Sequence, residues 1–495
     1  MRIPTGAKRL IRIVKAFACV ALAMGTGCAT LRATVSGYVT ERSGITRSQQ
    51  RLRDALSSAD YVKALAWHDD DALLQVMTRG IAAYYAGQFS RSAAVLDTAA
   101  LLSDDRVIAS LSKDALALVT NDMARPYQPR RTERLFIPYY AMLAYARVEQ
   151  WEEAAVEARR ISALLAQFGG DRDEGERSMH AAMAHLAGAV FEHAGERTDA
   201  QVAYRIAHAL LPALPEAAGG LSPDEGEVLV VVERGFVAHL TTEAIHLELD
   251  DEDHDELSHD DDSRRRAAGR LAARAASVPE RTVPSSSSVA SDYGVGTYAP
   301  GRRHHHEHDD DDYHLTIAYP SLRRSPHPWG PTLRLAVDDA SVSGLTVTSV
   351  VDNATEADAR RERLALATRA VARATAKYVM TKAVKDRKGE TAGEIANFGA
   401  SLLERADVRS WHLLPQELSI VRARVPAGRR VVRLELVDGG SVRNVEVGSV
   451  VVRQGELTIV PIRLWRDPPS APASVVAPVS VVATADSGCA ALRCP

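Results

Sequence analysis

The chain has 495 residues, of which 46% are hydrophobic and 25% are charged, so it is not a wholly disordered protein. Its formal net charge of −4 provides no overall basic field, and we expect no nucleic-acid partner. Four cysteines are too few for a disulfide-rich scaffold or for a zinc protein with many cysteine ligands. The length predicts about three domains.

The N-terminus has the pattern of an export signal. Basic residues between Arg2 and Lys15 precede the apolar run 16–24, which is too short to span a bilayer of about 30 Å as a helix. The small residues before Cys28 resemble a bacterial lipoprotein signal, although Gly25 stands where such signals usually carry Leu. The resemblance implies that residues 1–27 are removed and that a lipidated Cys28 anchors an outer-membrane lipoprotein facing the periplasm. Ordinary cleavage after Ala23 is the alternative.

Residues 28–70 are predicted to form a helical segment, and residues 71–225 a helical repeat domain. Tight turns at Gly87, Glu149 and Gly195 each lead into a helix that opens with small residues. This pattern predicts helical hairpins of the tetratricopeptide (TPR) type, in which Ala lets the two helices touch. The turns lie farther apart than the TPR period of about 34 residues, so the repeats are degenerate. An irregular helical bundle is the alternative.

A loop interrupts these hairpins between residues 110 and 130. Asn, Asp and Pro fold loops through local hydrogen bonds and a fixed φ, and Pro126 breaks any helix here. Inserts of a solenoid often lie on its binding face. We therefore expect Asn121, Asp122 and Tyr127 to bind a partner.

The next part of the chain changes from a strand to charged runs. Residues 226–249 begin with a β-branched run, which predicts a buried strand that leads to a second domain. Nine of the thirteen residues from Asp250 to Asp262 are carboxylates. Because like charges repel, residues 250–312 are predicted to be a disordered insertion, with at most a brief helix at 264–276. Its histidines could bind divalent metals, but a flexible run holds them only weakly; the candidates are His304, His305, His306 and His308.

Residues 313–466 are predicted to form a smaller α+β domain. Short strands lead to a long amphipathic helix, which we expect to start at a capping-box-like pair, Thr355 and Asp358. A second helix is expected at 391–405, followed by strands between 418 and 464 that form an antiparallel sheet or sandwich. The predicted fold class is therefore α+β, an all-α repeat domain followed by an α+β domain.

The C-terminal tail, residues 467–495, is rich in Pro, Ala and Val, and we predict it to be disordered. It holds Cys489 and Cys494, which could form a disulfide in an oxidising compartment or remain two free thiols.

The segment from Asp407 to Pro415 joins the second predicted helix to the sheet. Arg409 can pair bidentately with a carboxylate, and Trp411 can cover the edge of a core. We expect Asp407, Arg409 and Trp411 to form a structural junction, with a partner-binding anchor as the alternative. The acids Glu152, Glu153 and Glu157 are expected on a solvated helix face.

With these residues in view, the chain resembles an uncharacterised bacterial lipoprotein family with TPR-like repeats. The resemblance covers most of 70–240 and 314–465. It is carried by Cys28, by the 120–127 loop with Glu133-Arg134, by the strand that starts at Gly226, and by the 407–415 segment. It implies a location in the cell envelope and brings no known activity.

These observations favour a non-enzymatic scaffold whose stacked hairpins bind periplasmic or envelope proteins or peptides. Its membrane contact is the lipid anchor, and no cofactor is expected. An envelope enzyme acting on glycans or peptidoglycan is an alternative. It would need a pocket that gathers His412, Glu417 or Asp407 with another acid. Weak divalent-metal buffering by the histidine-rich run is a third reading.

Overall fold

The computed structural model describes residues 45–113, 125–169, 172–216, 222, 224–277, 314–324, 330–388, 406–466 and 474–475. Within these residues the fold is α+β, as expected, with helices first and three sheets after them. No helix in the described ranges is both long and apolar enough to cross a membrane. The expected helix at 391–405 lies outside these residues.

The N-terminal part is helical. It starts with α2 (Arg47–Ser57) and α3 (Tyr61–Leu65). Within the described residues, three antiparallel hairpins follow, and the short 3-10 helix η3 (Glu174–Glu176) precedes the last of them. The hairpins are α4 (Ala72–Tyr85) with α5 (Phe89–Lys113), α6 (Arg131–Arg147) with α7 (Trp151–Phe168), and α8 (Arg177–His193) with α9 (Arg197–Leu210).

The turns of these hairpins share one geometry. Gly87, Glu149 and Gly195 have φ of 74°, 58° and 79°. In each turn the N–H of the following residue donates to the carbonyl five positions earlier, as Gln88 does to Ala83. This combination is the Schellman motif, which ends a helix and reverses the chain. The helix–turn–helix pattern predicted at these positions is therefore confirmed.

The largest sheet is built around β1 (Glu225–Arg234). In the described chain its strand order is β11-β10-β1-β7-β6. β7 (Glu417–Pro426) pairs with β1 in antiparallel orientation, whereas β10 (Leu457–Leu464) pairs with it in parallel, with Val231 opposite Pro461. The expectation of a purely antiparallel sheet was wrong for β10. The outer strands are β6 (Leu345–Val350) and β11 (Ser474–Val475).

A second sheet covers one face of the first, and together they form the expected sandwich. The order of its described strands is β5 (Ala340–Val342), β4 (Thr332–Val337), β8 (Gly428–Asp438) and β9 (Ser441–Val452). Val228, Val230 and Val232 of β1 pack into a core with Leu434 of β8. The alternate β1 residues, such as Val231, join the core of the helices. The body thus has three layers, with the β1 sheet buried between the second sheet and the helices.

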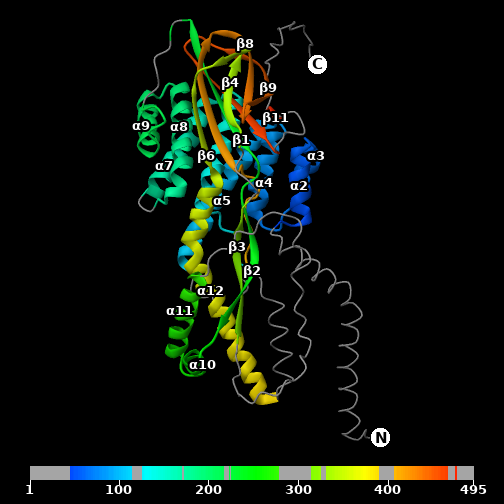
Figure 1. The fold of residues 1–495 in the computed structure, drawn as a ribbon, viewed down its shortest axis with the longest axis vertical. Helices are drawn as coiled ribbons and strands as arrows, with labels where there is room; N and C mark the ends of the chain where they lie inside the picture. The colour runs from blue at the N-terminus through cyan, green and yellow to red at the C-terminus, as the bar shows by residue number, and fades with distance from the viewer. Residues whose placement is uncertain are drawn as a thin grey trace, which may run out of the picture.

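An arm extends from this body (Figure 1). It consists of the paired strands β2 (His239–Glu248) and β3 (His314–Arg323), and of α10 (Asp251–Ser258), α11 (Asp261–Ser277) and α12 (Val351–Lys388). The apolar sides of α11 and α12 pack in one core, with Leu271 and Val371 fully buried. The helix expected at 264–276 is present as α11, but the disorder expected for the rest of 250–312 was wrong for 251–263, where α10 and the start of α11 lie. There the acidic run folds against the basic run that follows it, and Asp253 pairs with Arg270 and Arg274 at 2.9 and 3.0 Å.

The start of α12 also differs from the expectation. The helix begins at Val351, and the Thr355 hydroxyl donates to the Val351 carbonyl inside the first turns, so Thr355 is not a cap. Asp358 accepts a hydrogen bond from the backbone N–H of Thr132, 2.9 Å away at the start of α6. Asp358 of the expected capping box therefore attaches the arm to the helical part.

Candidate functional site

Most site residues predicted from the sequence lie outside the described residues: Cys28, Asn121, Asp122, His304, His305, His306, His308, Cys489 and Cys494. The structure places Tyr127, Asp407, Arg409 and Trp411, and it brings all four together where α6 meets the 407–414 segment. We call this region the junction.

Tyr127 is buried in the junction. Its side chain is 2% exposed, and its backbone N–H donates to Asp71, which also caps the start of α4. The guanidinium of Arg409 lies over its ring, 5.9 Å from the centroid. The expectation that Tyr127 binds a partner was therefore wrong. The physical reason is that the phenol packs into the core of the hairpins instead of facing solvent.

Arg409 connects the two segments of the junction. It donates to both carboxylate oxygens of Asp407, at 2.9 and 2.6 Å, which confirms the bidentate pairing. It also donates to the backbone carbonyl of Arg125, 2.8 Å away. The loop before α6 is therefore fixed to the 407–409 segment by a charged hydrogen-bond donor.

Glu133 is a junction residue that the sequence reasoning did not assign a role. Its Oε1 accepts the backbone N–H of Trp411 at 2.7 Å, and its Oε2 accepts that of Arg130 at 2.7 Å. The signal available was its place as the third residue of α6, where a capping-box acid sits. Trp411 is 1% exposed and meets Tyr140 edge to face. This burial fits the structural role expected for Trp411, which stays a prediction.

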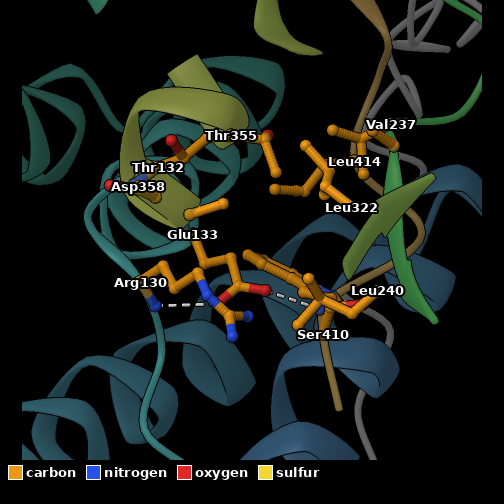
Figure 2. A pocket seen from close by; sticks show the side chains of 13 residues that line it. Arg130, Thr132, Glu133, Val237, Leu240, Leu322, Thr355, Asp358, Ser410 and Leu414 are labelled. Carbon is orange, nitrogen blue, oxygen red and sulfur yellow. Dashed lines mark hydrogen bonds between the residues drawn. The ribbon is translucent and has the colours of Figure 1, made fainter. Parts of the chain in front are cut away.

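A small cavity lies inside the junction, with Glu133 between Arg130 and the 410–411 segment (Figure 2). Its volume is about 10 Å³, which has room for about one water molecule and not for an organic ligand. Burial raises the pKa of Asp358 in its wall to about 7. The junction is a structural connection between α6, α12 and the sheet, and not a substrate pocket.

The acids and the histidine that an enzyme would gather each contact an arginine. His412 accepts a hydrogen bond from Arg53 at 3.2 Å, and burial lowers its pKa well below the usual range. Glu417 pairs with Arg234 at 2.5 Å, and Asp407 pairs with Arg409. Neither the junction cavity nor the cleft described below includes these side chains in its lining.

Buried charges also join the helices to the β1 sheet. Glu233 of β1 accepts hydrogen bonds from Tyr85 of α4 and Tyr139 of α6, and Arg463 of β10 lies 3.6 Å away. Arg422 of β7 pairs with Glu227 of β1 at 2.5 Å and with Glu192 of α8 at 3.1 Å. These groups occupy the inner face of the hairpins.

An open cleft lies between α5, α6 and α7. We call it the outer cleft; its volume is about 250 Å³. Arg134 and Arg160 stand on its walls, beside a largely apolar floor. Its lining residues are Ala100, Ser103, Asp104, Arg134, Ile137, Pro138, Arg160, Ala163, Leu164 and Gln167.

Behind the outer cleft, Arg160 pairs with Glu157 at 2.9 Å. Glu157 is buried, and this raises its pKa to about 7, so the expectation of a solvated acid was wrong for this residue. Glu152 and Glu153 are exposed, as expected. The described residues contain no group of three or more His, Cys, Asp or Glu side chains placed to hold a metal ion.

Comparison with known proteins gives no family. No family model and no curated protein matches the chain. The solved structure "MamA RS-1 ArsTM double mutant" is similar at 16% identity and a TM-score of 0.21, over 34% of this chain and 72% of that chain. A likeness at this level carries nothing over to the present protein.

Proposed function

We propose that this protein is a non-enzymatic lipoprotein of the bacterial cell envelope. In this proposal it is a scaffold for protein–protein interactions, built on TPR-like repeats and anchored in the outer membrane through Cys28. The three equal Schellman turns support the repeats, because a shared turn at each hairpin is what a repeated helix–turn–helix unit requires.

The observation that carries the proposal is the position of the outer cleft. A solenoid usually offers its inner face to partners. In this chain the β1 sheet covers that face through Glu233, Glu227 and Arg422. The outer cleft is an open hollow on the described part of the hairpins, away from the sheet, so the scaffold would bind its partner protein there.

Anchoring is tested by Cys28→Ser, because acylation supplies the membrane affinity. We expect the variant protein to move from the membrane fraction to the soluble envelope fraction, with an unchanged amount of total protein. A mature N-terminus at Met24 without a lipid, found by mass spectrometry, would refute the anchor.

Partner binding is tested by placing a photo-crosslinking amino acid at Ala163 of the outer cleft. The exposed Ala273 of the arm is the matched control position. We expect a discrete protein adduct at 163 in intact cells and none at 273. Equal adducts at both positions, or none at 163, would rule out the outer cleft as the binding surface.

A further inference from the structure

The outer cleft and the sheet use opposite faces of α6. With 3.6 residues per turn, Arg134, Ile137 and Pro138 share one face of this helix, and Phe136 with Tyr139 lie on the other. The first group lines the cleft, and Tyr139 contacts Glu233 of the sheet. A ligand in the outer cleft would therefore compete with no contact of the β1 sheet.

The floor of the outer cleft combines apolar surface with a hydrogen-bond acceptor. Leu164 and Ala100, which are both half-buried, provide the accessible apolar surface, and the buried Ile137 lies beneath them. Pro138 lies inside α6 and has no N–H, so the Arg134 carbonyl, four residues earlier, lacks its helical donor. The cleft thus borders a helix turn whose carbonyl can accept the backbone N–H of a bound chain.

Two partly exposed guanidinium groups stand on the walls of the cleft, and each has an acidic neighbour that an incoming anion would have to displace or share. Arg134 lies over the ring of Phe168, 5.4 Å from its centroid, which holds the guanidinium in place. Its ion pair with Asp104 is loose, at 3.8 Å, and Asp104 is 68% exposed. Arg160 is 40% exposed on the facing helix α7, where it pairs with Glu157 at 2.9 Å and lies 3.7 Å from Asp97. A carboxylate could replace Asp104 next to Arg134 and also approach Arg160.

We propose that the outer cleft binds a short acidic peptide segment of a partner protein. One apolar side chain would lie on Leu164 and Ala100, and the neighbouring Asp or Glu would lie between Arg134 and Arg160. The cleft is smaller than the roughly 300–1,000 Å³ of pockets for drug-sized ligands, so it fits one or two side chains. This proposal rests on the scaffold function and specifies the chemistry of its partner.

The test uses the purified full chain and an array of seven-residue peptides. Each peptide has a central Asp, Glu, Asn or Lys between two leucines and capped ends, and the Asp and Asn peptides have nearly the same shape and differ in charge. We expect the Asp and Glu peptides to bind at least tenfold more tightly than their Asn counterpart, and this preference to weaken at high salt. Equal binding of Asp and Asn peptides would overturn the proposal.

Variants place the interaction in the outer cleft. Arg134→Gln with Arg160→Gln should reduce binding of the acidic peptides at least tenfold. Arg159→Gln, also on α7 but paired with Glu196 outside the cleft, should leave it unchanged. Ala163→Trp fills the cleft without removing a charge and should abolish binding, which covers the case in which the double variant does not fold. Unchanged binding in Ala163→Trp would contradict the proposed site.

The two proposals can fail separately. If the crosslink at 163 forms but the array shows no charge preference, the scaffold stands and the acidic peptide is wrong. If the crosslink at 163 does not form, the scaffold proposal itself loses its binding surface.

Discussion

Single buried polar residues connect segments of this protein that are far apart in the sequence. Glu133 of α6 accepts the N–H of Trp411, and Arg409 reaches the loop before the same helix. The Asp407–Arg409 pair is local and could be predicted from the sequence. The pairing of Glu133 with Trp411 depends on how the sheet and the helices pack, and no local pattern contains that information.

We expect Glu133→Ala to destabilise the whole body. The substitution leaves the backbone N–H groups of Arg130 and Trp411 without their acceptor, at about 1–3 kcal/mol for each buried group. Urea unfolding followed by tryptophan fluorescence measures the loss. Glu152→Ala, an exposed acid on α7, is the control and should change the unfolding free energy by less than about 0.5 kcal/mol. Equal midpoints for the two variants would show that the Glu133 hydrogen bonds do not hold the junction.

Asp358 should give the protein a stability that depends on pH. Burial raises its pKa to about 7 in the folded state, above the ordinary value of 3.8, even though Thr132 donates to it and Arg361 lies 3.1 Å away. The folded state therefore holds its proton across about pH 4 to 7, where the unfolded state has lost it. The free energy of unfolding that Asp358 contributes is therefore fully present near pH 4 and is lost as the pH rises to about 7 and above.

The matching experiment is Asp358→Asn, which keeps an acceptor for Thr132 and cannot titrate. We expect the wild type to lose unfolding free energy relative to this variant between pH 5 and pH 8, as measured by urea unfolding at each pH. A difference between the two proteins that stays constant with pH would mean that Asp358 is ionised in the fold throughout.

At the scale of elements, the arm shows how charge runs can mislead. The acidic run at 250–262 is a like-charge block by itself, and such blocks do not form a core. The basic residues of α11 follow directly, and two of them neutralise Asp253. Leu257 and Leu271 then complete an apolar face against α12. The charges are visible in the sequence. The ion pairs between them form only because the turn between α10 and α11 brings the two helices side by side.

Leu271→Ala should open the arm and leave the body intact. Leu271 is fully buried, and truncation of such a side chain costs about 2–5 kcal/mol. Hydrogen exchange should become faster in residues 251–277 and 367–378 and remain unchanged in β1 and β7. Arg265→Ala, at an exposed position of α11, is the control with no expected effect. Unchanged exchange in the arm would show that α11 does not depend on this contact.

At the scale of the molecule, the sequence predicted most elements and missed how they associate. The hairpin turns and the strands of the sandwich follow from local residue patterns. The parallel pairing of β1 with β10 joins strands more than 200 positions apart, and local patterns do not determine such a partner. The same holds for the sheet that covers the inner face of the hairpins. The junction could be predicted as a structural region, whereas the outer cleft, made by three helices, could not.

The helical part should depend on the sheet for its stability. If the β1 sheet stabilises the hairpins, residues 45–216 expressed alone should not fold cooperatively. The separation exposes Tyr85 and Tyr139, which now surround Glu233, and leaves Glu192 without Arg422. We expect helical circular dichroism with a broad thermal transition for 45–216, and one sharp transition for 45–466. A sharp transition at the same midpoint for both would show that the hairpins are an independent domain, and the charged contacts with the sheet would then be a docking surface between two stable units.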